Sequence, residues 1–170
     1  MTSSIRRAVL SVGSNMGDRL AHLQGALDLL AERGVRILAV SSVYRTAPVG
    51  GPDQDDFLNA IAIVESTLTP HELLAVCWAI AARHGRVREV RWGPRTLDVD
   101  VIDVVDFAVD DDVLTVPHPR AHERAFVCVP WLEVDPEAAI AGREIATLQL
   151  DASGVHRCDD LRLVIAPGER

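Results

Sequence analysis

The chain has 170 residues, of which 48% are hydrophobic and 25% charged, and its formal net charge is −8. Its 17 basic residues are all Arg, and without Lys the chain has no Walker-type phosphate loop, no Schiff-base lysine and no β3 lysine of a protein kinase. This length and composition are typical of one globular domain spanning 1–170, and the acidic balance argues against a nucleic-acid or anionic-membrane surface.

Three cysteines, Cys77, Cys128 and Cys158, are widely spaced and form no Cys-x-x-Cys pair. An odd number of such residues is typical of reduced thiols in a cytoplasmic protein. The apolar run after Arg7 ends at Gly13, too early for a signal-peptide core, and no stretch reaches the ~20 apolar residues of a membrane span. We therefore expect a cytoplasmic monomer with no membrane or nucleic-acid partner.

The first third of the chain predicts a strand, a helix and two further strands. An apolar, β-branched run predicts a strand over Ile5–Val12, and apolar residues at helical spacing after Asp18 predict a helix that ends before Gly34. Strand composition returns over Val35–Tyr44. A loop rich in turn residues follows at 47–53, and the next strand is predicted over Phe57–Glu65.

The remainder predicts a second helix, a long loop and a fourth strand. Thr69-Pro70-His71-Glu72 forms a capping box with Pro at the first helical position, which predicts a helix to about Arg83. A loop over 84–94 and a strand over Leu97–Val105 follow. Beyond them we expect a turn at Asp110–Asp112, a returning strand over Val113–Val116 and a helix around Ala121–Glu133.

The order β-α-β-β-α-β favours an α+β fold of the ferredoxin-like α/β sandwich type. In this arrangement an antiparallel sheet packs its helices on one face. The hairpin near residue 111 and the late helix would be additions to it.

The strongest chemical signal is Asp98-x-Asp100, which directly follows a loop rich in Arg. Side chains alternate along a strand, so both carboxylates face one way with Cα atoms roughly 6.5 to 7 Å apart. Such a pair of carboxylates is suited to bind Mg²⁺. Two Mg²⁺ would clamp the attacking and leaving oxygens of a phosphoryl-type transfer. The alternative is a solvent face on which the Arg side chains simply pair with the two Asp.

The run 86–102, with Trp92-Gly93-Pro94-Arg95-Thr96-Leu97-Asp98-Val99-Asp100 at its centre, resembles the signature of the 6-hydroxymethyl-7,8-dihydropterin pyrophosphokinase family of folate biosynthesis. That family is also known as 2-amino-4-hydroxy-6-hydroxymethyldihydropteridine diphosphokinase. Five other segments agree in order with the family pattern, so that the resemblance covers residues 8 to about 136: 12–17, 42–48, 57–60, 114–119 and 124–127.

The resemblance implies transfer of the β,γ-diphosphoryl group of ATP to the pterin hydroxymethyl, with release of AMP. It makes Asp98 and Asp100 the ligands of two Mg²⁺, and Arg86 and Arg95 the catalytic pair that grips phosphate. The implied ATP-binding residues are Leu74, Arg86, Arg88, Trp92, Arg95, Val101, Thr115, His118 and Arg124. The implied pterin-binding residues are Thr46, Val49, Phe57, Asn59, Trp92 and Phe126.

Phe57 and Asn59 lie two apart on a strand and so share a face, which suits a flat heteroaromatic ligand that needs apolar faces and placed polar groups. Trp78, Ala81 and Pro119 depart from the residues of well-studied members near the ribose and base. These departures concern contacts to the nucleoside and leave the phosphate chemistry unchanged.

Other interpretations stay open on the residues alone. A nucleotidyltransferase also combines an early Gly-Ser with a later Asp-x-Asp, but it attacks the α-phosphorus and releases pyrophosphate. A ferredoxin-like ligand-binding domain would have no use for the paired Asp and loop Arg, and a closer alternative is a family member that acts on another pterin alcohol. A zinc site on His118, His122 and Cys128 is disfavoured because Pro119 interrupts the helix that would align them.

Overall fold

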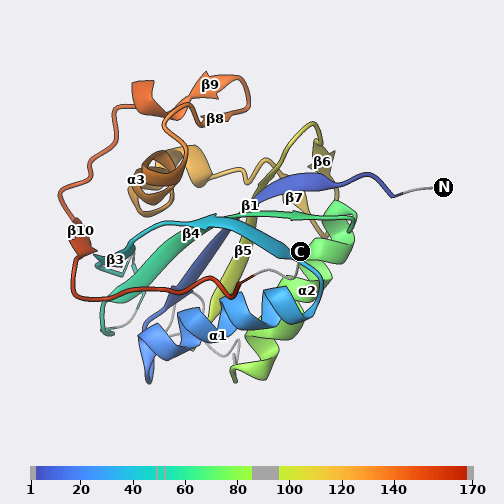
Figure 1. Cartoon of the computed structure of the whole chain (residues 1–170). Helices are drawn as coiled ribbons and strands as arrows, with labels where there is room; N and C mark the ends of the chain where they lie inside the picture. Colours follow the sequence, from blue (N-terminus) through green and yellow to red (C-terminus); the bar gives the residue numbers. More distant parts are fainter. Residues whose placement is uncertain (1–2, 49, 52, 86–95, 168–170) are drawn as a thin grey trace.

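The computed structural model describes residues 3–48, 50–51, 53–85 and 96–167, and in these ranges a six-stranded antiparallel sheet forms the centre of the molecule. The strands lie in the order β10-β3-β4-β1-β5, and β2 also pairs with β4. Figure 1 shows α1 and α2 on one face of this sheet and α3 on the other. The expected α+β, ferredoxin-like arrangement is confirmed, because the β-α-β-β-α-β order folds into a sheet in which β4 lies between β2 and β1.

The described part of the chain contains ten strands, three α-helices and two 3₁₀ turns. The strands are β1 Arg6–Ser14, β2 Arg36–Val40, β3 Val43–Thr46, β4 Phe57–Ser66, β5 Asp98–Val104, β6 Val109–Asp110, β7 Thr115–Val116, β8 Ala139–Ile140, β9 Arg143–Glu144 and β10 Val155–Cys158. The helices are α1 Arg19–Glu32, α2 Pro70–Arg83 and α3 Ala125–Val134, and the 3₁₀ turns are η1 Ala121–Glu123 and η2 Ile145–Thr147.

Helix α2 begins as the sequence predicts. The Glu72 N–H donates to the Thr69 hydroxyl at 3.2 Å, while the Thr69 N–H donates to the Glu72 carboxylate at 2.8 Å. Both bonds of the capping box satisfy N–H groups that have no partner within the helix. At α1, Asp18 accepts from the Ala21 N–H at 3.1 Å. The local sequence therefore encodes where α1 and α2 start.

The single strand predicted over Val35–Tyr44 is wrong, because the chain divides there into β2 and β3. Ser41 explains the break. Its N–H donates to the Ile61 carbonyl at 2.8 Å, but its hydroxyl, and not a backbone carbonyl, accepts from the Ile61 N–H at 2.9 Å. A side chain thus replaces one rung of the ladder and the strand restarts at Val43. The late helix also differs from its expected range, since 121–123 forms a 3₁₀ turn and α3 starts only at Ala125.

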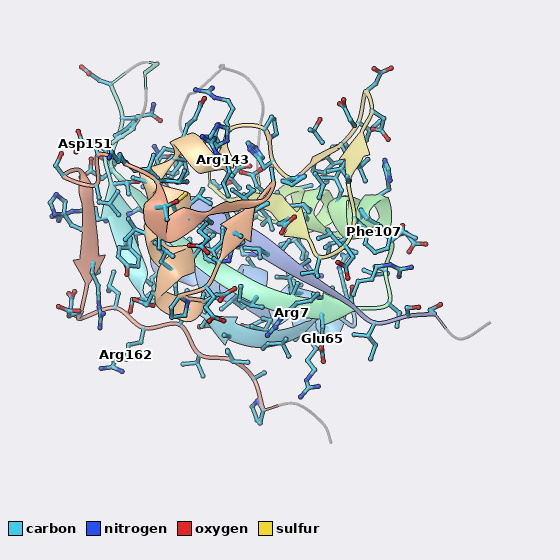
Figure 2. All side chains as sticks on the ribbon, turned by 90° about the horizontal axis from the view of Figure 1, so that it is seen from above. Arg7, Glu65, Phe107, Arg143, Asp151 and Arg162 are labelled. Atoms are coloured by element: carbon cyan, nitrogen blue, oxygen red, sulfur yellow. The ribbon has the colours of Figure 1, made fainter. Side chains whose placement is uncertain are left out.

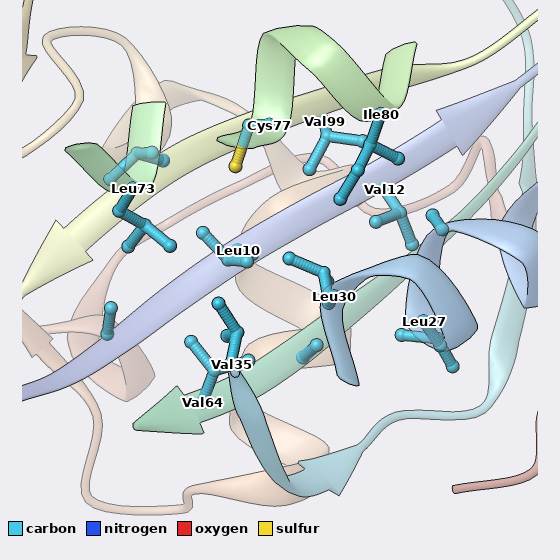
Figure 3. Packing of buried hydrophobic residues seen from close by; sticks show 14 of the residues in the cluster. Leu10, Val12, Leu27, Leu30, Val35, Val64, Leu73, Cys77, Ile80 and Val99 are labelled. Carbon is cyan, nitrogen blue, oxygen red and sulfur yellow. The ribbon is translucent and has the colours of Figure 1, made fainter. Parts of the chain in front are cut away.

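The main hydrophobic core lies between the sheet and the α1–α2 layer (Figure 3). Leu10 and Val12 of β1 meet Leu30 of α1 and Cys77 and Ile80 of α2, and all five are fully buried. Burial of a Leu or Ile side chain stabilises the fold by about 1.5–3 kcal/mol, so this layer carries much of the stability.

The opposite face of the sheet is apolar only in part. Val9, Ile61, Ile63 and Ile102 pack beneath α3, whose Trp131 is buried among them. Toward the other end of the same strands this face becomes polar, and α3 no longer covers it.

All three cysteines of the chain are free thiols. In the part of the chain that the structure describes, no helix is both long and apolar enough to cross a membrane.

Candidate active site

A pocket of about 400 Å³ lies on the α3 face, where the sheet surface turns polar. Its floor comes from strands β1, β3, β4 and β5, one wall from the start of α3 and another from the segment around β10. The described residues that line it are Ser11, Gly13, Thr46, Ala47, Phe57, Asn59, Asp98, Asp100, Arg120, Glu123, Arg124, Ala125, Phe126, Asp151, Gly154 and Val155.

Strand register places the carboxylates of β5 beside the smallest residues of β1. Gly13 pairs with Asp98 and Ser11 with Asp100. On the other side of β1, Gly13 pairs with Asn59 of β4. Because paired residues share a face, one row across the sheet runs from Asn59 over Gly13 to Asp98. The lack of bulk at Ser11 and Gly13 keeps the floor open between the amide and the carboxylates.

Gly13 is required for the position of Asn59. A Cβ at residue 13 would lie 2.7 Å from the Asn59 Oδ1 atom, closer than a normal contact. The Asn59 Nδ2 atom donates to the Thr46 hydroxyl at 2.7 Å, and both side chains are buried. This bond orients the amide, and Thr46 and Asn59 together form a fixed polar group at one end of the pocket.

The wall formed by η1 and α3 brings positive charge opposite the carboxylates. The guanidinium of Arg124 lies over the Phe126 ring, 5.6 Å from its centroid. Arg120 lines the same wall and approaches Glu123 at 3.7 Å. Arg120 and Arg124 thus border the half of the pocket that contains Asp98 and Asp100.

His118 lies close to this wall and is neutral at ordinary pH. Burial lowers its pKa to about 4, with the charges of Arg124 and Arg120 acting in the same direction and Asp98 opposing them. The Arg120 N–H donates to His118 Nδ1 at 3.2 Å, so Nδ1 is the acceptor and the ring proton resides on Nε2.

The structure brings together most of the sequence-predicted residues that it describes. Thr46, Phe57 and Asn59 lie in the pocket with Asp98, Asp100, Arg124 and Phe126. Leu74 and Val101 are instead buried in the core against the other face, Thr115 lies on β7, and these three and His118 are not among the lining residues. Their contact with ATP stays a prediction. Five predicted residues lie outside the described part of the chain: Val49, Arg86, Arg88, Trp92 and Arg95.

Several lining residues were not anticipated. Ser11 and Gly13 had a signal, since they alternate with Leu10 and Val12 along β1 and interrupt the apolar face. Glu123 belongs to η1, where a continuous helix was expected, and Arg120 directly precedes this turn. Asp151, Gly154 and Val155 belong to a segment far along the chain, and only the pairing of β10 with β3 brings them to the pocket.

The donor set fits a hard divalent cation held jointly with a ligand. Asp98 and Asp100 offer carboxylate oxygens from the same face of β5, the type of ligand that Mg²⁺ takes while keeping positions for water and phosphate oxygens. Among the residues described, no group of three or more His, Cys, Asp or Glu could hold a metal ion. At His118, the Nδ1 atom accepts a hydrogen bond from a backbone N–H.

The two halves of the pocket suit two kinds of ligand. Phe57 and Phe126 provide apolar surface beside the Asn59–Thr46 pair, which suits a flat ring with polar edges. The other half combines carboxylates with guanidinium groups, which suits a polyanion that enters with a divalent cation. A reaction between a ring substituent and a phosphate chain is the chemistry that this juxtaposition allows.

The chain is similar to known enzymes that join a ring substrate and phosphate groups. The family model described as 7,8-dihydro-6-hydroxymethylpterin-pyrophosphokinase matches residues 9–136. A protein of Methylorubrum extorquens named 2-amino-4-hydroxy-6-hydroxymethyldihydropteridine pyrophosphokinase is 48% identical over 156 residues, which are 90% of this chain and 99% of that protein. Proteins with the same name from Mycobacterium tuberculosis and Bacillus subtilis are 45% and 40% identical, over 79% and 87% of this chain and 75% and 87% of their own.

Among solved structures, that of wild-type HPPK-DHPS from Plasmodium falciparum with SDX-DHP matches with a TM-score of 0.69. The sequences are 15% identical, and the match covers 86% of this chain and 44% of that longer one. At this identity the likeness concerns the fold alone, and it agrees with the antiparallel sheet and helix layers described above.

We expect Gly13→Ala to destabilise the fold by about 1–3 kcal/mol, because the new methyl group overlaps the Asn59 amide and forces it from Thr46. Chemical denaturation measures the change. In an Asn59→Ala background the same substitution should cost less than about 1 kcal/mol, since the overlapping atom is gone. Equal costs in both backgrounds would show that Asn59 is not the atom group that excludes a side chain at 13.

We expect His118 to make stability depend on pH between 6.5 and about 4. In this window the unfolded chain binds a proton that the folded chain does not, so stability is complete above 6.5 and falls as pH decreases toward 4. His118→Gln should reduce the change in the free energy of unfolding across this pH window by about 2 kcal/mol. Urea unfolding at several pH values measures it, and His156→Gln, at an exposed position, is the control. A slope unchanged by His118→Gln would contradict the expectation.

Proposed function

The chain belongs to the 7,8-dihydro-6-hydroxymethylpterin-pyrophosphokinase family of enzymes, and on this premise we propose that it carries out the Mg²⁺-dependent transfer of the diphosphoryl group of ATP to 6-hydroxymethyl-7,8-dihydropterin. The products are AMP and the pterin diphosphate, an intermediate of folate biosynthesis. The observation that carries the proposal is one pocket in which Asn59 and Thr46 form one end while Asp98, Asp100 and Arg124 form the other.

At the pterin end, the ring lies against Phe57 and Phe126, and Asn59 reads its polar edge. The amide is suited to this role because its Nδ2 is committed to the Thr46 hydroxyl, so that Oδ1 keeps a fixed direction. A donor edge of the substrate finds an acceptor that needs no rearrangement. Val49 and Trp92, which lie outside the described residues, complete this group in the proposal.

At the phosphate end, Asp98 and Asp100 hold two Mg²⁺, which when bound neutralise the triphosphate and polarise its oxygens. Arg124 contributes a guanidinium on the facing wall, and its position over Phe126 places it between the phosphates and the ring. Arg86, Arg88 and Arg95 precede β5 in the sequence and lie outside the described residues, and in the proposal they add charge at this end. Because the chain has no Lys, the permanently cationic side chains that it can offer to phosphate are all guanidinium groups.

The reaction forms a bond between the hydroxymethyl oxygen and the β-phosphorus of ATP. The bond from that phosphorus to the bridging α-β oxygen breaks, AMP leaves with the electron pair, and the hydroxyl proton passes to solvent water. Such a transfer depends mainly on positioning and charge neutralisation, so little covalent chemistry is needed from the protein. His118, being neutral, can donate from Nε2 without adding a charge beside Arg124.

Two properties stay predictions alongside this function. We expect the chain to act as a monomer and in the cytoplasm, since the small-molecule substrates need neither a membrane nor a nucleic-acid partner.

We expect Asp98→Ala and Asp100→Ala each to abolish turnover while the protein stays folded, because the cation loses half of its protein ligands. The assay incubates ATP, Mg²⁺ and 6-hydroxymethyl-7,8-dihydropterin and measures AMP and pterin diphosphate. Asp103→Ala, on the same strand but outside the pocket, should remain active. Pyrophosphate and a nucleotidylated pterin as products would instead identify a nucleotidyltransferase, and full activity of both pocket variants would exclude the metal role.

We expect Arg95→Ala to lower kcat by about 10²- to 10³-fold, because a guanidinium that meets developing phosphoryl charge contributes several kcal/mol to the transition state. Steady-state kinetics in the same assay measures this loss. Arg162→Ala, at an exposed position far along the chain, is the matched control and should leave kcat unchanged. A wild-type kcat for the Arg95 variant would show that catalysis does not need this guanidinium.

A further inference from the structure

The segment that carries β10 forms a wall of the pocket at its ring-binding end. Asp151, Gly154 and Val155 line the pocket there, beyond residues 9–136 that the family model matches. Figure 2, which looks down on the α3 side, shows Asp151 and the neighbouring β10 at one edge of the sheet. The family resemblance therefore assigns these residues no role.

Register shows why this segment faces the ring and not the phosphates. Val155 pairs with Thr46 of β3, and Thr46 pairs with Phe57 of β4. The three residues form one row on the pocket face of the sheet, next to the row that contains Asn59. Val155 is thus a direct neighbour of Thr46 and lies in the same row as Phe57, both of which are proposed to hold the pterin, while Asp98 and Asp100 lie on β5 at the far side of the sheet.

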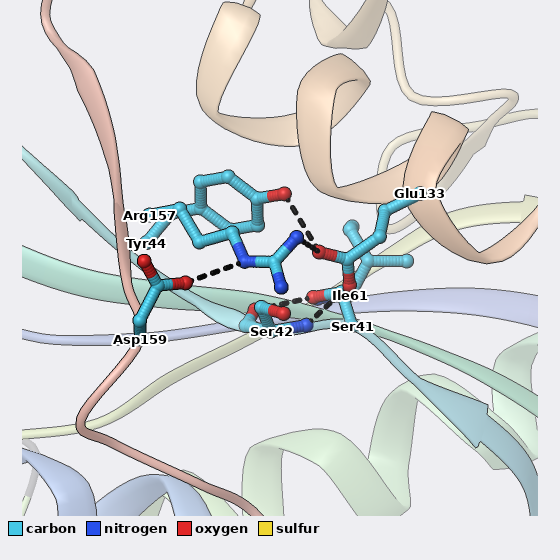
Figure 4. A network of polar contacts seen from close by, with 7 residues as sticks. All are labelled: Ser41, Ser42, Tyr44, Ile61, Glu133, Arg157 and Asp159. Carbon is cyan, nitrogen blue, oxygen red and sulfur yellow. Dashed lines mark hydrogen bonds and ion pairs between the residues drawn. The ribbon is translucent and has the colours of Figure 1, made fainter.

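A carboxylate from α3 contacts both β3 and the edge strand β10 (Figure 4). Glu133 accepts from the Ser42 N–H and, at 2.8 Å, from the Tyr44 hydroxyl, which lies on β3. Arg157 of β10 approaches Glu133 at 3.7 Å and Asp159 at 2.9 Å. We call Glu133, Tyr44 and Arg157 the edge clamp, because together they link α3, β3 and β10.

The clamp is a charged one under ordinary conditions. Burial acts to raise the pKa of Glu133, but the donors at Ser42 and Tyr44 outweigh it and hold that pKa below its usual range. Burial and the neighbouring carboxylate raise the pKa of Tyr44 to about 12, so its hydroxyl keeps its proton and remains a donor. A charge-assisted hydrogen bond of this kind is stronger than a neutral one, which suits the fixing of β3, the strand that pairs with β10.

We infer that Gly154 and Val155 determine which acceptor the pocket admits, and that Glu133 is a positioning residue that sets them against the ring through the edge clamp. The inference rests on the proposed function for the identity of the acceptor. The ring-binding end of the pocket is closed by β10, a strand that α3 holds, so the size of this end depends on the position of β10.

Gly154 offers a direct steric test. A Cβ placed there would meet nothing within 4 Å, and the backbone lies outside the left-handed region, so a side chain can be added without strain in the free protein. Gly154→Leu therefore places an isobutyl group at the pocket while leaving the fold intact. His156→Leu is the matched control, because this exposed residue of β10 does not line the pocket.

The experiment measures dissociation constants for 6-hydroxymethyl-7,8-dihydropterin, with saturating α,β-methylene-ATP and Mg²⁺, and separately for that nucleotide alone. We expect Gly154→Leu to weaken pterin binding about tenfold or more and nucleotide binding less than about twofold, and His156→Leu to change neither. Unchanged pterin affinity in a folded Gly154→Leu protein would overturn the inference. A wild-type protein that forms no AMP and pterin diphosphate would instead reject the proposed function.

Variants of Glu133 test the positioning role. Glu133→Ala should raise KM for the pterin with KM for ATP nearly constant, because only the ring-binding end loses its support. Glu133→Gln keeps an acceptor for Tyr44 and should recover most of the loss. Thermal unfolding is measured in parallel, and equal rises in both KM values, or no recovery by Gln, would show that Glu133 contributes to stability alone.

Discussion

The packing of Gly13 against Asn59 is the constraint on which the pocket depends. Strand β1 lies at the centre of the sheet and must be apolar toward α1 and α2 along its whole length. On its other face it carries only Ser11 and Gly13 where α3 withdraws. A larger residue at 13 would meet the amide of Asn59, so the polar row from Asn59 to Asp98 exists because β1 contributes no side chain between them.

The charge of the protein as a whole says little about its ligand. A net charge of −8 would repel a triphosphate, yet Arg120 and Arg124 are brought to one wall of the pocket and Asp98 and Asp100 to its floor. Coulomb interactions between exposed charges decay within about 10 Å at moderate salt, so local arrangement outweighs the total. An acidic chain without Lys can therefore bind a polyanion through a few guanidinium groups and divalent cations.

The two ends of the pocket are built by different parts of the fold. The phosphate end uses β5 and the start of α3, which lie inside the family match, whereas the ring-binding end also uses β10, which lies outside it. Glu133 joins these parts, since it stands on α3 and holds β3 and β10 through Tyr44 and Arg157. One carboxylate thus links the part of the sheet that the family model matches to a wall that lies beyond the matched residues.

The sequence by itself determined the local features: the capping box of α2, the alternation that puts Asp98 and Asp100 on one face and Leu97 and Val99 in the core, and the shared face of Phe57 and Asn59. These follow from the period of a strand and from hydrogen bonds within one turn. The break at Ser41, the need for Gly13 and the arrival of Val155 beside Thr46 were decided only by the tertiary structure. Each of them depends on a partner distant in the chain, and a residue pattern does not specify which strand will lie beside another.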